Sequence, residues 1–192
     1  MKTSIEGRRA LITGAGSGIG RAVAQRLSEL GCDVVLVGRT GATLNETATL
    51  CPGATKTVTC DLADESSILA LVGYIRATGG LDILVNNAGM VQSGPLEGIS
   101  TEEFDAVMAT NVRAPFILMR ETLPLLKASP SPEIINVCSV VAHEGYPNQS
   151  AYVASKHALC GLSKSFANEV FDDGVRVHLI SPGGVLTDMV AK

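Results

Sequence analysis

The chain has 192 residues, of which 46% are hydrophobic and 18% charged, and this composition favours one compact globular domain over a disordered segment. Its formal net charge of −4 argues against broad binding to nucleic acid or to anionic membranes, because such binding requires a basic surface. No run reaches the ~18 apolar residues of a membrane span, and the polar first residues are unlike a signal peptide, so we expect a cytoplasmic protein.

The cysteines and histidines give no sign of a metal centre. The cysteines are odd in number, widely spaced and free of CxxC pairs, at Cys32, Cys51, Cys60, Cys138 and Cys160. Without a secretory signal, we predict reduced thiols that pack as small apolar side chains. The histidines form no HExxH motif and no cluster with cysteine. The sequence therefore predicts no metal site.

Short apolar runs that resemble strands alternate with longer runs that resemble helices. In chain order, the sequence predicts a strand at 10–13, a helix at 18–30, a strand at 33–37, a helix at 42–50, a strand at 57–60, a helix at 64–78 and a strand at 82–86. A helix at 100–127, a strand at 133–137, a helix at 150–171 and a strand at 175–180 follow.

The long helix at 100–127 has a defined start and an expected irregularity. Ser100 and Glu103 have the spacing of a capping box, which satisfies free amides at a helix N-terminus. Pro115 and Pro124 lie inside the helix. Because proline lacks an amide hydrogen and crowds the preceding turn, we expect a kink.

The order of the predicted elements indicates the fold class. The strands are continuous apolar runs rather than alternating ones, as in parallel sheets that helices cover on both faces. Right-handed βαβ crossovers then give an α/β fold with a doubly wound parallel sheet, a three-layer Rossmann arrangement. The only linker-like patch is at 129–132, and there is no internal repeat. We therefore predict a single domain over residues 1–192.

A glycine-rich turn, TGAGSGIG at 13–20, separates the first predicted strand from the first predicted helix. Glycine permits a tight turn and a close approach of ligand to backbone, and the amides of a helix N-terminus attract a pyrophosphate. No Lys and Ser/Thr pair follows, which excludes a Walker loop. The alternative is a glycine turn without a ligand. We predict contacts with a dinucleotide from Gly14, Gly16, Ser17, Gly18, Ile19 and Gly20.

The end of the second predicted strand indicates which dinucleotide binds. An acidic residue about 20 positions after the glycines would bind the ribose of NAD, but this chain has Arg39 there. A guanidinium favours the 2′-phosphate of NADP through charge-assisted hydrogen bonds; the alternative is a solvated surface arginine. Asp61 and Leu62 follow the third strand and would touch the adenine, unless Asp61 only caps the next helix.

Tyr152 and Lys156 are four residues apart on the helix at 150–171, so they share one of its faces. Ser139 lies just beyond the strand at 133–137. In doubly wound folds, ligands bind at this carboxyl edge of the sheet. The alternative is an exposed tyrosine, a surface lysine and a capping serine. We favour a catalytic site, because the three side chains come to one edge.

These side chains suit the reduction of a carbonyl by hydride transfer. The resulting alkoxide-like oxygen needs a proton, and a phenol can donate it, although the ordinary tyrosine pKa of ~10 is poorly matched to neutral pH. The Lys156 cation and the positive nicotinamide of the oxidised complex would lower the pKa of Tyr152, because both favour the phenolate. Ser139 would hydrogen-bond the substrate oxygen.

Taken together, the motifs resemble those of the short-chain dehydrogenase/reductase family. They span nearly the whole chain in the family's order: TGxxxGxG at 13–20, Asn86-Asn87-Ala88-Gly89, Asn111, Ser139, Tyr152-x-x-x-Lys156 and Pro182-Gly183. The resemblance implies a nicotinamide-dependent oxidoreductase whose one domain both binds the cofactor and catalyses. Ser17 speaks against NADP, because NADP-preferring family members often carry a second basic residue at its position.

The resemblance also implies roles for individual residues. Tyr152 would be the catalytic acid/base, Ser139 would orient the substrate oxygen, and Lys156 would also bind the nicotinamide ribose. Asn111 would hold a water that connects Lys156 to solvent; alternatively, it is a polar residue that kinks its helix. The cofactor site would further include Asn87, Ala88 and Gly89, which support the central sheet, and Pro182, Gly183, Val185 and Thr187 at the nicotinamide end.

The family pattern is shortened at the C-terminal end. Family members usually continue past Thr187 with a segment over the substrate, a helix and a further strand, so we expect this chain to lack the last strand and helix. The strand at 175–180 would then expose a pairing edge, which predicts poor solubility or capture of a partner. The helices at 100–127 and 150–171 resemble those in family dimers, so we expect a homodimer or homotetramer.

The leading prediction is therefore an NADP(H)-dependent reductase or dehydrogenase for a small or lipid-like carbonyl or alcohol. A dinucleotide-binding sensor or scaffold without turnover is the alternative. A serine hydrolase built on Ser139 is disfavoured, because no GxSxG motif surrounds it. His143 is expected at the pocket rim rather than as a second acid/base. The substrate is not named by the residues near the reacting centre, which are Met90, Gln92, Val140, Val141, His143, Glu144 and Tyr146.

Overall fold

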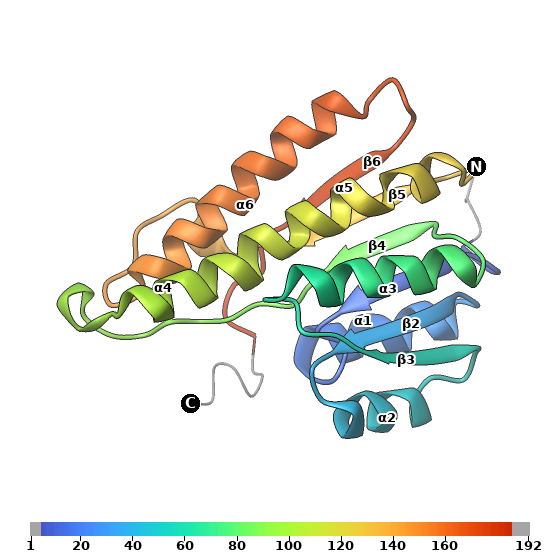
Figure 1. The fold of residues 1–192 in the computed structure, drawn as a ribbon, viewed down its shortest axis with the longest axis horizontal. Coiled ribbons are helices and arrows are strands. Elements are labelled where there is room, and N and C mark those ends of the chain that lie inside the picture. Colours follow the sequence, from blue (N-terminus) through green and yellow to red (C-terminus); the bar gives the residue numbers. More distant parts are fainter. Residues whose placement is uncertain (1–4, 186–192) are drawn as a thin grey trace.

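A six-stranded parallel sheet forms the centre of the computed structural model, which describes residues 5–185 (Figure 1). The strand order is β3-β2-β1-β4-β5-β6, and every neighbouring pair is parallel. This order reverses between β1 and β4, as the doubly wound prediction requires. The strands are β1 (Arg9–Thr13), β2 (Asp33–Gly38), β3 (Thr55–Thr59), β4 (Ile83–Asn86), β5 (Glu133–Val137) and β6 (Arg176–Ile180).

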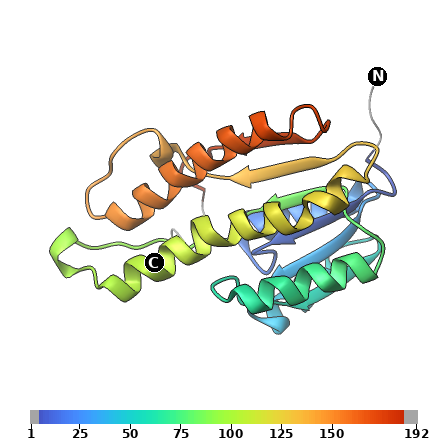
Figure 2. The ribbon, with the colours of Figure 1, turned by 45° about the horizontal axis from the view of Figure 1, so that its top comes forward.

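Helices lie on both faces of the sheet and confirm the predicted three-layer arrangement. One face is covered by α1 (Gly18–Glu29) and α2 (Gly41–Thr49). The other carries α3 (Glu65–Ala77), α5 (Ala114–Lys127) and α6 (Ser150–Glu169), which lie side by side in Figure 2. The remaining elements are η1 (Leu96–Gly98), α4 (Thr101–Met108), η2 (Ala109–Arg113) and η3 (Val140–Ala142).

Successive residues of the central strands point into two separate cores. Leu11 packs in the core that includes Ile68 of α3 and Ile117 of α5. Its neighbour Ile12 packs in the other core, which includes Leu44 of α2. Successive side chains of a strand point to opposite faces of the sheet, and here both faces are buried. Both sets of side chains are therefore apolar, which makes the sequence of each central strand a continuous apolar run.

The edge strands differ from this prediction. In β6 the burial alternates between exposed and half-buried residues, whereas β3 combines half-buried and exposed residues without strict alternation, and neither strand has a fully buried residue. An edge strand is covered less completely, so both edge strands lack the continuous burial of the central strands, and a pattern of period two appears in β6. The expected exposed edge at β6 is present among the described residues, where Ile180 is 49% exposed.

The long predicted helix is interrupted, but not by a proline kink. It consists of α4, the π-helical turn η2 and α5. Ser100 caps its start by accepting a hydrogen bond from the amide of Glu103 at 3.1 Å. Pro115 lies in the first turn of α5, where a missing amide is tolerated, and α5 continues through Pro124. The irregularity is therefore the extra residue of the π turn, a feature that often marks functional sites.

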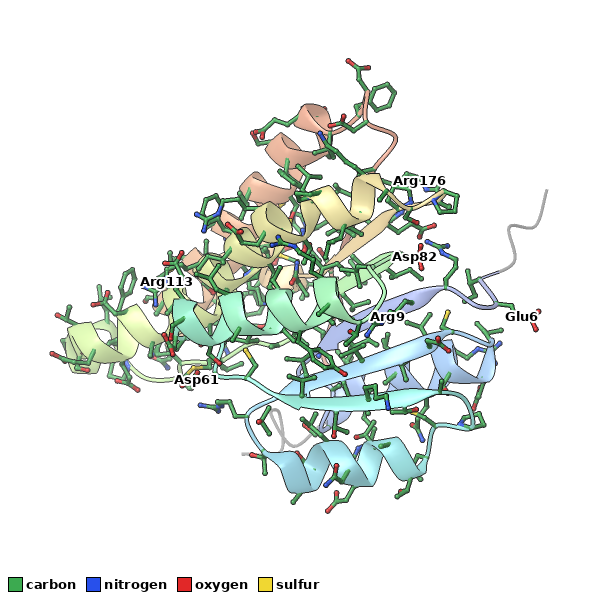
Figure 3. The ribbon with its side chains drawn as sticks, turned by 45° about the vertical axis from the view of Figure 1, so that its right-hand side comes forward. Glu6, Arg9, Asp61, Asp82, Arg113 and Arg176 are labelled. Carbon is green, nitrogen blue, oxygen red and sulfur yellow. The ribbon has the colours of Figure 1, made fainter. Side chains whose placement is uncertain are left out.

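Charged side chains connect the amino ends of the strands, far from the edge where ligands bind. Glu133 at the start of β5 contacts Arg8 at 3.4 Å and Arg176 of β6 at 2.6 Å. Figure 3 shows Arg176 and Asp82 at this end of the sheet and Asp61 and Arg113 at the other. Burial acts to raise the pKa of Glu133, but the hydrogen bonds and charges of Arg176 and Arg8 outweigh it, so the pKa lies below 4.5.

This ion cluster predicts an acid-sensitive contribution to stability. Because the folded pKa of Glu133 is depressed, its stabilisation is complete above pH 4.5 and is lost as the pH falls through the folded pKa. Glu133→Gln should lower the free energy of unfolding at neutral pH by about 1–2 kcal/mol. In urea denaturation, the difference from wild type should shrink at acid pH. Glu29→Gln, in the exposed pair with Arg26, is the control and should change little.

Candidate active site

A cavity of about 320 Å³ opens at the carboxyl edge of the sheet. Segments that follow β1, β2, β3, β4 and β5 line it together with α6, as expected for a ligand site at a topological switch point. The sequence-predicted residues that line it are Gly14, Gly16, Ser17, Gly18, Ile19, Arg39, Asp61, Leu62, Asn87, Ala88, Gly89, Tyr152 and Lys156.

The glycine turn is shaped by close backbone contacts. Gly14 has φ +65°, and a Cβ there would lie 2.9 Å from the Ala88 Cα. A Cβ on Gly20 would overlap the carbonyl oxygen of Gly14, so Gly20 permits close packing and does not line the cavity. Ser17, the N-cap of α1, makes no capping hydrogen bond with its side chain. Its hydroxyl therefore leaves the first-turn amides free to bind an anion.

Hydrogen bonds tie this turn to the end of β4. The Thr13 hydroxyl accepts from the amides of Asn87 at 3.0 Å and Ala88 at 3.1 Å. The side chain of Asn87 donates to the Thr13 carbonyl at 2.9 Å. The structural part of the role expected for Asn87 is thus visible, and the same residue also lines the cavity.

The end of the cavity where we expect the adenosine carries both polar and basic groups. Arg39 is exposed at the end of β2 and is joined there by Thr40 and Thr43. Thr40, the N-cap of α2, makes no capping hydrogen bond with its side chain. Asp61 accepts from the amide of Ala63 at 3.0 Å, whereas the cap of α3 is Asp64. The capping alternative for Asp61 is therefore wrong.

Tyr152 and Lys156 reach the same cavity from one face of α6. The Lys156 Nζ lies 5.8 Å from the centroid of the Tyr152 ring and donates to the Val137 carbonyl at 2.9 Å. Ser139 is close enough to Tyr152 to lower the pKa of its phenol, and the Ser139 oxygen accepts from the Val141 amide at 3.3 Å. The structure thus brings the serine, tyrosine and lysine together.

Burial is the largest cause of the pKa shifts of both Tyr152 and Lys156. Burial raises the pKa of Tyr152 above 10.0, the hydrogen bond from Ser139 lowers it, and the nearby Cys138 thiolate would raise it. Burial lowers the pKa of Lys156 below 10.5, since the residue is 4% exposed. The expected lowering of the Tyr152 pKa is therefore not present in the protein alone, because Lys156 does not compensate for the lost solvation of the phenolate.

Asn111 lies in the π turn η2 and is 1% exposed. Its Oδ1 accepts from the Met90 amide at 2.7 Å, and its Nδ2 donates to the Met90 carbonyl at 2.8 Å and to the Ser155 hydroxyl at 2.9 Å. A Cβ on Gly89 would lie 3.4 Å from the Asn111 Oδ1 and 3.7 Å from the Lys156 Nζ. Asn111 therefore sits close to the lysine, with the Gly89 backbone beside both.

The nicotinamide end is described only in part. The Pro182 carbonyl accepts from the Val140 amide at 3.0 Å, which brings this turn next to Ser139. Pro182, Gly183 and Val185 do not line the cavity, and Val185 is 39% exposed. Thr187 lies outside the described residues.

Several cavity residues were not predicted. Each lies within a few residues of a predicted one, so its position near the end of a strand could have indicated it. The side chains are apolar or small, however, and gave no chemical reason to select them. These residues are Gly38, Thr40, Thr43, Cys60, Thr110, Val137 and Cys138, whereas Met90, which also lines the cavity, was expected near the reacting centre. Among residues 5–185, no group of three or more His, Cys, Asp or Glu side chains is arranged to hold a metal. No helix in that range is long and apolar enough to cross a membrane.

Known proteins of one family match this chain along its length. The family model described as short chain dehydrogenase matches residues 8–192. The D-beta-hydroxybutyrate dehydrogenase of Rhizobium meliloti is 37% identical over 96% of this chain and 74% of its own length. The chain belongs to the short-chain dehydrogenase/reductase family.

Solved structures of the family share the fold. A metagenomic short-chain oxidoreductase in complex with NADP is 38% identical, with a TM-score of 0.89 over 95% of this chain and 85% of that one. A short chain dehydrogenase/reductase from Burkholderia phymatum in complex with NAD is 30% identical, with a TM-score of 0.92 over 97% of this chain and 69% of that one. This family member is an NAD(P)-dependent oxidoreductase, and its relatives include both NADP and NAD complexes.

The cavity of this oxidoreductase fits a dinucleotide. Uncapped amides at the start of α1 are complementary to a pyrophosphate, and a side chain on Gly14 would fill the turn where the backbone must approach it. The fit rests on the backbone shape as much as on charge.

Gly14→Ala should therefore weaken cofactor binding. The substitution places a Cβ 2.9 Å from the Ala88 Cα in a left-handed conformation, so the turn must shift. We expect a loss of roughly 1–2 kcal/mol in unfolding free energy, and at least tenfold weaker binding in NADPH fluorescence titrations. Gly73→Ala, in the interior of α3 with nothing within 4 Å of its Cβ, is the control and should keep both properties. Equal affinities of the two variants would contradict the assignment of the turn.

Proposed function

We propose that this reductase transfers a hydride between NADP(H) and a small or lipid-like carbonyl or alcohol, with Tyr152 as the acid/base. The observation that carries the proposal is the position of Tyr152 in the cavity, where its ring centroid lies 5.8 Å from the Lys156 Nζ and Ser139 is close enough to lower the pKa of its phenol. Both helical side chains line the cavity that contains the glycine turn. The whole chain acts as one domain for binding and catalysis.

The chain's own groups handle the proton. In carbonyl reduction, the Ser139 hydroxyl orients the substrate oxygen, and the Tyr152 hydroxyl donates its proton as charge develops there. The bound nicotinamide supplies or accepts the hydride, and its oxidised ring adds a positive charge. In alcohol oxidation, Tyr152 takes up the proton as phenolate. The raised pKa of Tyr152 keeps the phenol protonated at neutral pH but makes it a weaker acid, so proton donation requires the positive charges of Lys156 and of the oxidised nicotinamide to lower the pKa.

Lys156 and Asn111 support this proton transfer. Lys156 holds a fixed position through its bond to the Val137 carbonyl and places a cation beside the phenol. A buried cation favours the phenolate, so it opposes part of the cost of ionising Tyr152. We assign Asn111 the water that connects this lysine to solvent, and we assign the turn at 182–187 to the nicotinamide end. The proximity of Asn111 and Lys156 around Gly89 supports the first assignment.

Arg39 supports a preference for NADP. It lies exposed at the rim of the cavity, with the hydroxyl residues Thr40 and Thr43 beside it. A guanidinium and hydroxyl donors match a phosphate monoester, and a carboxylate at this position would repel it.

The chain also has a surface suited to self-association. A hollow lined by Ala106, Val112, Phe116 and Leu162 lies between the helices α4, α5 and α6. Phe104 and Phe116 are 41% and 43% exposed. We propose a homodimer or homotetramer through these helices, since exposed aromatic groups gain most from burial. The cysteines are free, in keeping with the reducing cytoplasm we expect for this protein.

A sensor or scaffold without turnover is the second candidate function. A sensor would need the cofactor cavity but not the proton donor. A requirement for Tyr152 in turnover would therefore distinguish an enzyme from a sensor. The hydrolase alternative gains nothing from the structure, since His143 contacts Ser181 at 3.3 Å.

Tyr152→Phe should abolish most turnover while cofactor binding remains. The variant removes only the phenolic oxygen, and general acid catalysis contributes roughly 10²–10⁴-fold, so kcat should fall by that factor. NADPH oxidation with a panel of ketones measures turnover, and fluorescence titration measures binding. Tyr74→Phe, on α3 away from the cavity, is the matched control. Wild-type protein that binds NADPH but oxidises it with no ketone would favour the sensor.

Arg39→Asp should shift the cofactor preference from NADP toward NAD. Exchange of a cation for a carboxylate beside the 2′-phosphate should weaken NADPH binding by at least roughly 10²-fold and affect NADH far less. The ratio of the two dissociation constants is the measurement. Arg76→Asp on α3 changes the net charge equally and should leave the ratio as it is. A ratio unaffected by Arg39→Asp would refute the phosphate contact.

A further inference from the structure

The loop between β4 and η1 is hydrogen-bonded to the start of α6, the helix that carries Tyr152. Gln92 in this loop is 3% exposed, and its Oε1 accepts a hydrogen bond from the Ala151 amide at 3.3 Å. Its Nε2 donates to the Gly94 carbonyl at 3.3 Å, and the Gly94 amide donates to the Asn148 carbonyl at 2.8 Å. Gln92 is therefore a buried polar side chain that joins two distant segments.

Helix α6 lacks a cap from its own neighbours. Gln149 is the N-cap residue, but its side chain makes no capping hydrogen bond. The preceding Asn148 has φ 62°, a left-handed conformation that brings the chain sharply into the helix. The first amides of a helix need acceptors from outside the helix. Gln92 supplies one of them from a segment more than fifty residues away in sequence (|i−j| = 59).

The same loop is held from the other side by Asn111, which binds both the amide and the carbonyl of Met90. Asn111 also donates to the Ser155 hydroxyl, and this hydroxyl donates to the carbonyl of Tyr152 at 2.7 Å. Ser155 is fully buried. The bonds form a closed ring that runs from the loop through Asn111 and Ser155 to Tyr152, and returns to the loop through Gln92.

We propose that Gln92 is a positioning residue for Tyr152, which fixes the first turn of α6 so that the phenol stays within reach of Ser139. The inference rests on the proposed function, because it assigns Tyr152 the proton transfer. Tyr152 directly follows the amide that Gln92 holds. Shifts of about 1 Å in a reacting group can cost up to ~10²-fold in rate, so a loosened first turn should be visible in kcat.

Gln92→Met tests the proposal, because methionine keeps the length and burial of the side chain but removes the acceptor. We expect kcat for ketone reduction to fall roughly tenfold, with the dissociation constant for NADPH unchanged, since the glycine turn is not touched. Amide hydrogen exchange at Ala151 should become faster. Gln92→Glu keeps an oxygen acceptor for the Ala151 amide but loses the donor to the Gly94 carbonyl, so exchange at Ala151 should stay slow and kcat should recover in part.

Thr122→Val separates positioning from general loss of stability. It removes a buried hydrogen bond within α5, between the Thr122 hydroxyl and the Leu118 carbonyl at 2.6 Å. This variant should lower the melting temperature but keep the wild-type kcat and the exchange rate of Ala151. Wild-type kcat in Gln92→Met would overturn the proposal, and so would unchanged exchange at Ala151.

The exchange measurement does not depend on turnover. If the wild-type protein reduces no ketone, the proposed function fails, and the role of Gln92 in holding the helix start is judged by exchange at Ala151 alone. If the wild type is active, Tyr152→Phe loses turnover and Gln92→Met keeps the wild-type kcat, the proposed function stands and the positioning role of Gln92 is wrong.

Discussion

The hydrogen bonds between the ends of β1 and β4 are the constraint on which the candidate site depends. The Thr13 hydroxyl and carbonyl hold Asn87 and Ala88 at the point where the strand order reverses. From this point the chain leaves toward helices on opposite faces, so the segments beyond the strands separate and a cavity opens between them. The glycine turn forms one side of the opening, and the loop after β4 leads to the residues around Tyr152.

Burial determines the charge state of the reacting groups. The Lys156 ammonium and the Tyr152 phenol both lose solvation, which opposes the charged form of each. Fixed hydrogen bonds offset part of this cost, through the Val137 carbonyl for the lysine and through Ser139 for the tyrosine. The protein alone therefore holds Tyr152 as a neutral phenol, and ionisation requires a further positive charge in the cavity.

Much of the fold could be predicted from local pattern. The strand predicted at 133–137 is β5 with identical bounds, and the central strands read correctly because both of their faces are buried. The predictions from local pattern were wrong for the two edge strands and for the long helix, whose surroundings a local pattern does not describe. The strands β3 and β6 have no fully buried residue because they lie at the edges, and the break in the long helix is the π turn around Asn111 rather than a proline kink.

The order of elements, the glycine turn and the spacing of Tyr152 and Lys156 can be derived from the amino-acid sequence, since each follows from neighbours a few residues apart. Which groups meet depends on the way the elements pack. The contact of Gln92 with the start of α6, the entry of Thr43 into the cavity and the upward shift of the Tyr152 pKa could not be read locally. Each depends on segments far apart in sequence that the sheet brings together, and on the burial that their packing creates.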